Sequence, residues 1–340
     1  MLDRTEQGRS TGTLKPRIAF LGTGWIGLNR MEAMVAAGSA EVVAVCDPSE
    51  EMRSKACELA SEAEAVGSLE EVLDIAPDGI VIATPSALHA GQAIAALERG
   101  IAVFCQKPLG RTAAEVEEVV AAAAKADRLL GVDLSYRCTE GMTRIRDLVR
   151  AQEFGHIFAV ELEFHNAYGP DKDWFYNRTL SGGGCLIDLG VHLADLALWT
   201  LDFPQVETVQ GGLFRGGRRL GGGSEEVEDY AAASIRLQTG TSVRLSCSWN
   251  LHAGQDAVIS ARFFGTEGSA QWRNVGGSFF DFTAERYRGT AAEVLACPPD
   301  DWGPRAACAW LRQLSLDPGF DPGACSYLHS AQIIDRIYGR

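Results

Sequence analysis

The architecture of the chain is indicated most clearly by RIAFLGTGWIGLNRMEAMVAAGSAEVVAVCD, residues 17–47. The stretch opens with an apolar run ending on glycine, which is typical of a buried strand. A helical pattern follows and closes at Gly38, and a valine-rich strand then runs to Asp47. The motif Gly-Thr-Gly-Trp-Ile-Gly (22–27) therefore lies between a strand and a helix, as in a dinucleotide-binding unit.

Each part of this loop has a physical task in binding a dinucleotide. Gly22 permits a tight turn, Gly24 lets a pyrophosphate approach the backbone, and Gly27 lets helix and strand pack closely. The carboxylate of Asp47 suits a ribose diol and would repel a 2′-phosphate, so the sequence predicts NAD rather than NADP. The plainer alternative is a tight turn followed by a capping acid. The cofactor-binding residues predicted here are Gly22, Gly24, Trp25, Ile26, Gly27 and Asp47.

Strands and helices keep alternating as far as residue 134. Apolar runs predict strands at 78–84, 101–106 and 129–134, and helical patterns occupy 52–65, 88–100 and 112–127. Such alternation is typical of a doubly wound parallel sheet, in which ligands bind beyond the carboxyl ends of the strands. Three further stretches fall at those ends: Thr84-Pro85-Ser86, Gln106-Lys107-Pro108 and Ser135-Tyr136-Arg137.

Lys107 attracts attention because it closes an apolar strand and is followed by proline. A lysine at this place would point toward a nicotinamide ring. It could exchange protons with a substrate hydroxyl, or stay charged and polarise that hydroxyl. By position alone, the alternative is a surface lysine in a loop.

The pattern changes after about residue 154, where apolar and polar residues alternate as in half-buried strands. The predicted strands are 156–165, 205–214, 230–238, 241–250 and 257–265, with a helix at 186–200 and final helices at 303–314 and 324–338. The glycine-rich piece 211–223 is interpreted as a flexible loop. The prediction is an α/β chain: a disordered tail (1–15), a Rossmann domain (16–137), and an α+β domain (138–340) with a large, mostly antiparallel open sheet.

Four motifs together resemble those of the Gfo/Idh/MocA family of oxidoreductases, which includes glucose-fructose oxidoreductases and inositol dehydrogenases. They are GTGWIG (22–27), ATPSALH (83–89), CQKP (105–108) and GGGCLIDLGVH (182–192), and the resemblance runs from about residue 16 to 338. The family usually has Glu-Lys-Pro where this chain has Gln106-Lys107-Pro108, so the lysine is kept and a neighbouring acid is lost. The resemblance adds Thr84, Pro85, Ser86, His89, Gln106 and Lys107 to the expected cofactor-binding residues.

The same resemblance implies a mechanism. His192 would be the general base for a carbinol hydroxyl, with Lys107 sharing the proton relay or stabilising alkoxide charge. Asp188 lies four residues before His192 on one predicted helix face, so it would orient the imidazole and bind a substrate hydroxyl. Asp195 is expected to be structural. The predicted catalytic residues are Lys107, Asp188 and His192.

The substrate implied by the resemblance is a sugar, inositol or related polyol, oxidised with NAD. Aromatic residues of the 165–180 stretch suit pyranose rings, and among them Trp174 and Tyr176 are expected to approach the substrate, with Tyr168, Phe175 and Arg178 nearby. The other predicted substrate contacts are Tyr136, Arg137, Lys107, Asp188 and His192, with Trp249 and His252 as weaker candidates. Two alternatives stay open: an NAD-retaining glycosidase of the same family, and a dinucleotide-binding sensor without activity.

The composition excludes several classes of partner. The formal net charge of −14 disfavours nucleic acid and anionic membranes, which bind through lysine and arginine. No apolar run approaches the roughly 20 residues that span a bilayer. The nine cysteines are scattered without a C-x-x-C pair, so neither a metal site nor a disulfide framework is predicted, and reduced thiols favour the cytoplasm. The family resemblance implies a homodimer or homotetramer formed through the C-terminal sheet.

Overall fold

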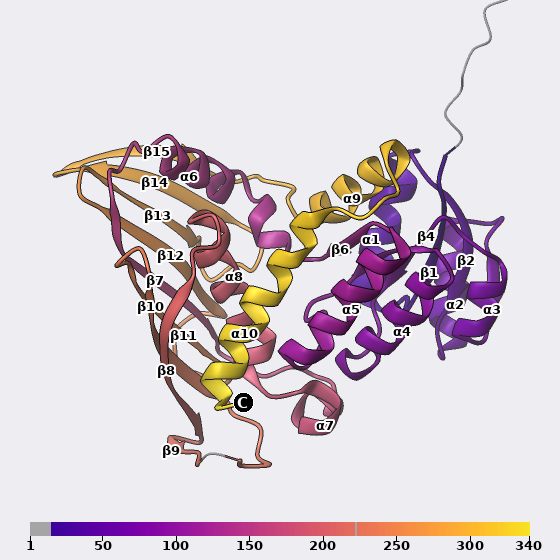
Figure 1. The fold of residues 1–340 in the computed structure, drawn as a ribbon, viewed down its shortest axis with the longest axis horizontal. Coiled ribbons are helices and arrows are strands. Elements are labelled where there is room, and N and C mark those ends of the chain that lie inside the picture. Colours follow the sequence, from indigo (N-terminus) through magenta and orange to yellow (C-terminus); the bar gives the residue numbers. More distant parts are fainter. Residues whose placement is uncertain (1–14, 222) are drawn as a thin grey trace, which may run out of the picture.

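The computed structural model describes residues 15–221 and 223–340, so the tail predicted at 1–15 lies outside the described residues except for its last residue. Two sheets organise the chain and lie side by side (Figure 1). The first is parallel, with strand order β3-β2-β1-β4-β5-β6. The order reverses between β1 and β4, which opens a crevice at the carboxyl ends of the strands. The strands are β1 (Arg17–Leu21), β2 (Glu41–Cys46), β3 (Glu64–Val66), β4 (Gly79–Ile82), β5 (Ala102–Cys105) and β6 (Leu130–Val132).

Helices cover both faces of the parallel sheet, which explains why its strands are apolar almost throughout. On one face lie α1 (Trp25–Ala36), α2 (Glu50–Leu59) and the late helix α9 (Arg305–Leu316). On the other lie α3 (Leu69–Asp74), α4 (Ser86–Glu98) and α5 (Ala113–Ala126). The side chains of Ser49, Ser68 and Thr112 accept backbone N–H groups at the starts of α2, α3 and α5, as N-caps do.

The second sheet has nine strands in the order β15-β14-β13-β12-β7-β11-β10-β8-β9. It is antiparallel except where β7 pairs with β11. The strands are β7 (Ile157–Asn166), β8 (Val206–Arg215), β9 (Arg218–Arg219), β10 (Tyr230–Leu237), β11 (Ser242–Ser248), β12 (Ala257–Gly265), β13 (Ser269–Asn274), β14 (Phe282–Arg288) and β15 (Ala291–Ala296).

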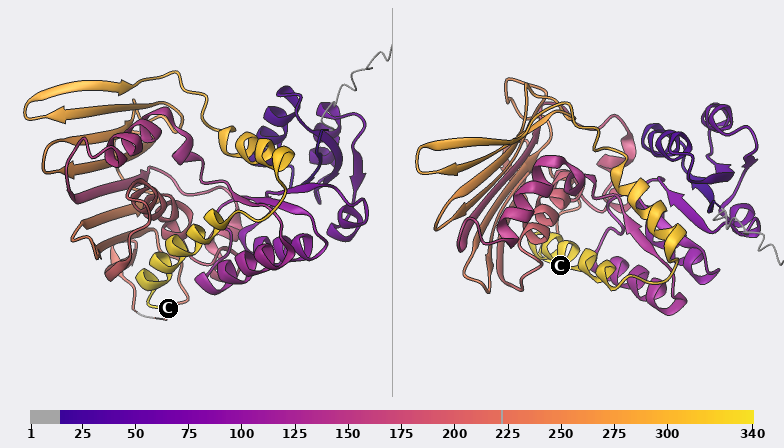
Figure 2. Two further views of the ribbon diagram at one scale, coloured as in Figure 1. Left: turned by 45° about the horizontal axis from the view of Figure 1, so that its top comes forward. Right: turned by 90° about the horizontal axis from the view of Figure 1, so that it is seen from above.

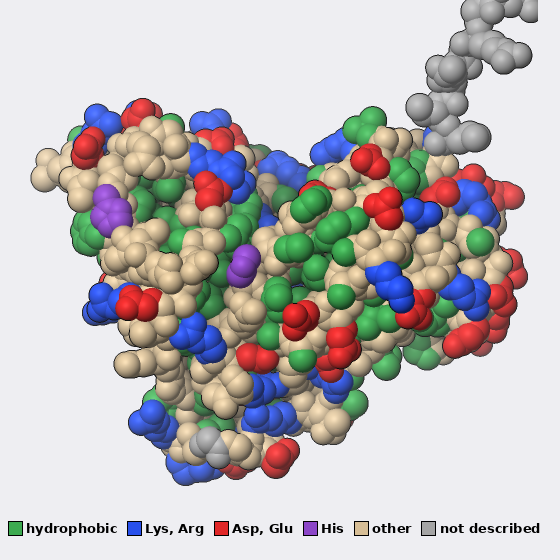
Figure 3. All heavy atoms as spheres, in the orientation of Figure 1, with side chains coloured by type: hydrophobic (Ala, Val, Ile, Leu, Met, Phe, Trp, Pro, Cys, Tyr) green, Lys and Arg blue, Asp and Glu red, His purple; other side chains and the backbone are tan. Residues whose placement is uncertain are grey.

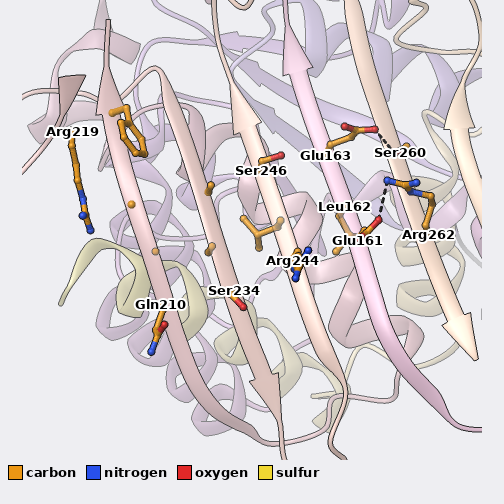
Figure 4. A pocket seen from close by; sticks show the side chains of 16 residues that line it. Glu161, Leu162, Glu163, Gln210, Arg219, Ser234, Arg244, Ser246, Ser260 and Arg262 are labelled. Carbon is orange, nitrogen blue, oxygen red and sulfur yellow. Dashed lines mark hydrogen bonds and ion pairs between the residues drawn. The ribbon is translucent and has the colours of Figure 1, made fainter. Parts of the chain in front are cut away.

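The two faces of the nine-stranded sheet differ. Helices α6 (Glu140–Arg150), α8 (Val191–Thr200) and α10 (Ser326–Tyr338) pack on the face toward the parallel sheet, and the opposite face carries no helix among the described residues (Figure 2). That bare face has a polar hollow of about 720 Å³. Figure 4 shows side chains of neighbouring strands in this hollow, including the Arg262–Glu161 ion pair at 2.9 Å and the Ser260–Glu163 hydrogen bond at 2.7 Å.

The predicted fold class is confirmed, but several elements were not predicted. The helix predicted at 52–65 ends at Leu59, and the chain then adds β3 to the sheet edge and continues into α3. Helix α6 and strands β13 to β15 were also absent from the prediction. The glycine-rich piece 211–223, expected to be a flexible loop, is largely a hairpin. Gly216 and Gly217 both have positive φ (55° and 76°), which a tight turn between β8 and β9 requires.

The last helices return to different parts of the molecule. Trp310 and Leu311 of α9 pack in the core of the parallel sheet, although they belong to the predicted second domain. Helix α10 contacts α5 of the first half and α8 of the second. The chain therefore crosses between the two sheets more than once. The predicted domain boundary at 137/138 remains a prediction.

The surface and the helices bear on possible partners. Figure 3 shows Asp and Glu side chains crowded over the edge of the molecule that carries α2 and α3, in keeping with the net charge of −14. No helix in the parts of the chain that the structure describes is long and apolar enough to cross a membrane.

Candidate active site

The loop between β1 and α1 keeps open the space in front of the helix. A Cβ on Gly24 would meet no atom within 4 Å, whereas one on Gly27 would lie 2.1 Å from the carbonyl oxygen of Gly22. Gly22 itself has φ +88°. Helix α1 begins without a side-chain cap and without an acid in its first turn, so its N–H groups are left for an anion. The loop therefore fits the pyrophosphate of a dinucleotide.

Asp47 lies at the end of β2, beside the glycine loop. Its carboxylate accepts hydrogen bonds from the backbone N–H of Thr23 at 2.8 Å and of Ser49 at 2.9 Å, one on each oxygen. Each carboxylate oxygen has two lone pairs, so both can accept a further hydroxyl. The side chain is therefore held in place by the loop and still has the acceptors that a ribose diol needs.

Thr84, Pro85 and His89 hold the backbone around the site in place. The Thr84 hydroxyl donates to Gln92 Oε1 at 2.6 Å, and Pro85 is the N-cap of α4. The ring nitrogens of the buried His89 lie 2.7 Å from the carbonyl oxygen of Pro108 and 2.6 Å from that of Thr84. Burial lowers the pKa of His89, while its contacts with the carbonyl oxygens of Pro108 and Thr84 oppose the shift. His89 thus ties the end of β4 to the turn after Lys107, and its predicted contact with the cofactor stays a prediction.

Lys107 joins the two halves of the molecule. Its Nζ donates to Asp188 Oδ1 at 2.7 Å and to the backbone oxygen of Asp188 at 2.9 Å. The other carboxylate oxygen, Oδ2, accepts the indole N–H of Trp249 at 3.1 Å. Two anchors therefore fix Asp188, and Asp188 in turn fixes the ammonium group at the edge of the cleft.

The segment carrying Asp188 is a π-helical turn, Leu186–Gly190, followed by α8, where one regular helix was predicted. Single π turns of this kind often occur at functional sites. The buried carboxylate of Glu228 holds its start, accepting the N–H groups of Gly184 and Leu186 at 2.9 and 3.0 Å and the hydroxyl of Tyr338 at 2.7 Å. Burial raises the pKa of Glu228, while these three donors oppose the shift.

The three consecutive glycines 182–184 could allow unusual backbone angles or a close approach of another group. Gly182 does have a positive φ of 86°. At the other two positions, protein groups make the close approach. A Cβ on Gly183 would lie 1.9 Å from the Tyr338 hydroxyl, and one on Gly184 would lie 1.9 Å from the carbonyl oxygen of Glu228.

His192 borders a cavity of about 490 Å³ between the two sheets, together with Lys107. Its ring packs edge-on against Tyr136, with centroids 4.8 Å apart. Burial, and secondarily the charge of Lys107, lower the pKa of His192 well below its usual value. The predicted contact between Asp188 and His192 is not formed: the Asp188 carboxylate accepts from Lys107 and Trp249 instead. Among the described residues the imidazole nitrogens have no hydrogen-bond partner, and the ring is available to a ligand.

Arg137 follows β6 as expected, but its side chain does not border the cavity. The predicted substrate contact instead forms a two-pronged ion pair with Asp195, with Arg137 Nε 2.6 Å from Oδ2 and Nη2 on Oδ1. Its guanidinium lies over the rings of Trp199 and Phe203. Ser330 of α10 also donates to Asp195 at 3.4 Å. The expectation that Asp195 is structural agrees with this geometry, and Arg137 belongs to the same structural pair.

The aromatic wall of the cavity also differs from the expectation. Trp174 stacks on Phe175 at 3.8 Å, the hydroxyl of Tyr176 donates to the carbonyl oxygen of Pro170, and neither side chain borders the cavity. His252 is exposed and likewise lies outside its lining. The aromatic side chains that do border it are Trp25, Tyr136, Phe164, Phe279, Phe280 and Trp302. Only Trp25 and Tyr136 were predicted site residues, although the phenylalanine pair after Gly276-Gly277 was a signal for an exposed apolar loop.

A buried polar cluster forms another part of the cavity wall. Arg30 Nε donates to Asp133 Oδ2 at 2.7 Å, and the amide of Gln106 donates to the same oxygen at 2.5 Å. The sequence reasoning named Gln106 but missed Arg30 and Asp133, which come from α1 and from the turn after β6. In the described residues no group of three or more His, Cys, Asp or Glu side chains is arranged to hold a metal ion.

Comparison with known proteins gives the geometry its context. Residues 16–134 match the family model "Oxidoreductase family, NAD-binding Rossmann fold", and residues 142–271 match "GFO/IDH/MocA C-terminal domain". D-glucoside 3-dehydrogenase of Escherichia coli (strain K12) is 27% identical over 77% of this chain and 78% of its own length. Inositol 2-dehydrogenase of Acidiphilium cryptum (strain JF-5) is 31% identical over 75% of this chain and 73% of its own.

The fold is also found among solved structures. A 3-ketoreductase from Actinomadura kijaniata, in complex with NADP and TDP-benzene, has a TM-score of 0.81 at 20% identity, covering 95% of this chain and 97% of the other. At this identity the likeness speaks for the fold alone. The family models and the inositol 2-dehydrogenase carry the assignment, and the chain belongs to the Gfo/Idh/MocA family of oxidoreductases.

Proposed function

We propose that this oxidoreductase moves a hydride between NAD and a hydroxyl-bearing carbon of a sugar or polyol, with His192 and Lys107 handling the hydroxyl proton. One observation carries the proposal: Lys107 and His192 border the same cavity as Trp25 and Ile26 of the glycine-rich loop that fits a dinucleotide. The names of the curated relatives, a glucoside dehydrogenase and an inositol dehydrogenase, support the substrate class.

The roles follow from the contacts. His192 is neutral and has nitrogens free for a ligand, so it accepts the hydroxyl proton. Lys107 donates a hydrogen bond to the same oxygen and stabilises the charge that develops there. Asp188 holds Lys107 and, through Trp249, is itself held, so it acts as a positioning residue. When bound, the nicotinamide would supply the hydride acceptor. Gly22, Gly24, Trp25, Ile26 and Gly27 are the residues that would hold its pyrophosphate.

The preference for NAD over NADP rests on Asp47. Its two oxygens lie beside the glycine loop with acceptors to spare, and a 2′-phosphate brought there would meet a negative charge. Asp47→Ala is expected to weaken NADH binding and to bring the dissociation constants of NADH and NADPH closer together, as measured by fluorescence titration. Equal binding of the two cofactors by the wild type would refute the assignment.

We also propose that the bare face of the nine-stranded sheet is a contact between copies of this chain. A broad, half-polar sheet face without a helix supports this, and sedimentation at several protein concentrations tests it. A cytoplasmic location is proposed from the scattered cysteines, and cell fractionation tests it.

The function itself is tested by following reduced nicotinamide absorbance with purified protein, NAD and a panel of inositols, aldoses and glycosides. A rise with one of them supports the dehydrogenase. Release of an aglycone without net consumption of NAD would identify the retained-cofactor glycosidase. NADH binding without turnover of any compound would favour the sensor.

A further inference from the structure

The cations that border the cavity are each matched by a carboxylate. Lys107 Nζ lies 2.7 Å from Asp188 Oδ1, and Arg30 Nε lies 2.7 Å from Asp133 Oδ2. Arg30 and Asp133 are almost wholly buried, with side chains 7% and 1% exposed, so this pair cannot rearrange without leaving a charge in the interior. Lysine and arginine side chains are what normally hold a phosphate or carboxylate, and here both are already engaged.

Two further acids lie at the mouth of the same cavity, after β15. Asp300 pairs with Arg305 at 2.5 Å and accepts the backbone N–H of Glu140 at 2.8 Å. Asp301 borders the cavity and is exposed, and among the described residues it has neither a hydrogen-bond partner nor an ion pair. Among the residues that border the cavity, Asp301 is thus an acid without an ion pair, and neither cation is without one.

The remaining wall at the mouth is aromatic. Trp25, from the glycine-rich loop, is 67% exposed, and Phe280, from the β13–β14 loop, is 56% exposed, with ring centroids 6.4 Å apart. Trp302 donates its indole N–H to the carbonyl oxygen of Phe280 at 2.8 Å, which fixes that loop. Large apolar faces left exposed at a cleft commonly mark a binding surface. They suit the C–H faces of a sugar ring and do not compensate an anionic group.

We propose that the part of the substrate entering this cleft is an uncharged, hydroxyl-rich ring, and that the site discriminates against sugars carrying a phosphate, a nucleoside diphosphate or a carboxylate. The inference rests on the proposed function and narrows it. An anionic group in this cavity would lose its hydration without finding an unmatched cation and would face Asp301, so both binding and turnover suffer. The pyrophosphate of the cofactor escapes this penalty because the start of α1 receives it.

The test uses matched pairs with the same ring: a neutral hexose or methyl glycoside against its 6-phosphate, its uronate and its nucleoside-diphosphate form. Two readouts are taken. Binding to the protein–NADH complex is followed by tryptophan fluorescence, because Trp25 and Trp302 border the cavity, and is confirmed by calorimetry. Turnover with NAD is followed by absorbance. We expect kcat/KM and affinity to fall at least about 100-fold from the neutral to the anionic member of each pair.

The outcomes separate this inference from the proposed function. Tight binding of a neutral sugar without turnover, together with poor binding of its anionic partner, would support the inference and overturn the dehydrogenase. Equal or better binding of the anionic member would overturn the inference, whether or not the neutral sugar is oxidised.

A variant sharpens the result. Asp301→Asn should narrow the difference in kcat/KM between neutral and anionic sugars several-fold, because removing the charge improves kcat/KM for the anionic member more than for the neutral one. Glu98→Gln, which removes one exposed charge from α4 away from the cavity, is the matched control and should leave this difference as it is. If both variants reduce the difference in kcat/KM between neutral and anionic sugars equally, the effect comes from the overall charge of the protein, and the role of Asp301 is refuted.

Discussion

Two ion pairs join the halves of this molecule, and they make a useful comparison. Lys107 follows β5 and binds Asp188, while Arg137 follows β6 and binds Asp195, seven residues further along the same helical segment. In the first pair, the Lys107 ammonium donates to Asp188 Oδ1, and Lys107 borders the cavity between the two sheets. The second is two-pronged, lies over aromatic rings and stays away from the cavity.

The chemistry of the two cations explains why the arrangement works. Arginine does not lose its proton in proteins, and its planar fork matches a carboxylate, so it suits a fixed link. Lysine is a compact charge with three donors, so Lys107 can hold Asp188 and still offer a proton to a ligand. Two similar ion pairs in one interface can therefore be distinguished by their cations. A cation with unused donors can serve the chemistry, and a cation whose donors are fixed by its partner serves the structure.

The largest effect is expected from Lys107→Met. Removing the ammonium should lower kcat by about 10³-fold, within the range for loss of a group that aids proton transfer. NADH affinity should change little, because the glycine-rich loop provides the pyrophosphate site. Steady-state kinetics and fluorescence titration measure both quantities. Lys107→Arg, which keeps the charge, is the control, and a normal rate in Lys107→Met would remove the lysine from the mechanism.

Breaking the other pair should affect stability instead. Arg137→Met leaves Asp195 buried without its main partner, which is expected to cost about 3–5 kcal/mol in the free energy of unfolding. Denaturant titration measures the loss. The double variant Arg137→Met/Asp195→Leu should recover much of it, because no buried charge is then left behind. A variant that keeps its stability but loses kcat would show that Arg137 acts in the chemistry.

A smaller effect is expected at Gln106, where the family's usual residue is glutamate. Restoring the acid by Gln106→Glu would put a second carboxylate at the 2.5 Å contact with Asp133, with only Arg30 to balance the two. We expect kcat/KM to fall about tenfold, because like charges this close cannot both ionise without cost. Gln106→Glu/Asp133→Asn exchanges acid and amide and should restore most of the rate in a double-mutant cycle. Additive losses would argue against this coupling.

The smallest effect concerns pH. Burial and the charge of Lys107 hold the pKa of His192 well below its ordinary value of 6.5, so the ring stays neutral as the pH falls through 6.5. Accordingly, kcat/KM should change less than about twofold between pH 7.5 and 6.5 and decline only at lower pH. A pH–rate profile measures this. An acidic limb centred at 6.5 and lost in His192→Asn would show that the histidine titrates normally and that its surroundings are more solvated than the structure indicates.

Local patterns in the sequence predicted the parts of the site that local geometry determines. Glycine spacing and apolar runs predicted the places of loop 22–27 and Lys107 in the fold, while the family resemblance pointed to His192; the roles of these residues stay predictions. Local patterns could not predict contacts between segments that lie far apart in the sequence. Glu228 holds Gly184 and Leu186 from 42 to 44 positions away, and no pattern near Glu228 announces that role.

Arg137 shows the other limit. The sequence placed it correctly at a strand end and named Asp195 as structural, but nothing local says that these two side chains meet across 58 positions. The π turn at Leu186–Gly190 was also unpredictable, because its apolar spacing reads as an ordinary helix until the Glu228 and Lys107 contacts are in place.

The contact between Tyr338 and Glu228 makes the segment before Asp188 depend on a helix far along the chain. The six strands of the parallel sheet all lie within residues 17–132, so their ladder hydrogen bonds need no later residue, although Trp310 and Leu311 of α9 complete the core of this sheet. The glycine run before Asp188 is held by Glu228, which in turn accepts the hydroxyl of Tyr338. Arg340 also donates to the carbonyl oxygen of Gly182 at 2.9 Å. A chain that ends before residue 338 would therefore keep all six strands of the parallel sheet but lack both contacts that hold the glycine run before Asp188.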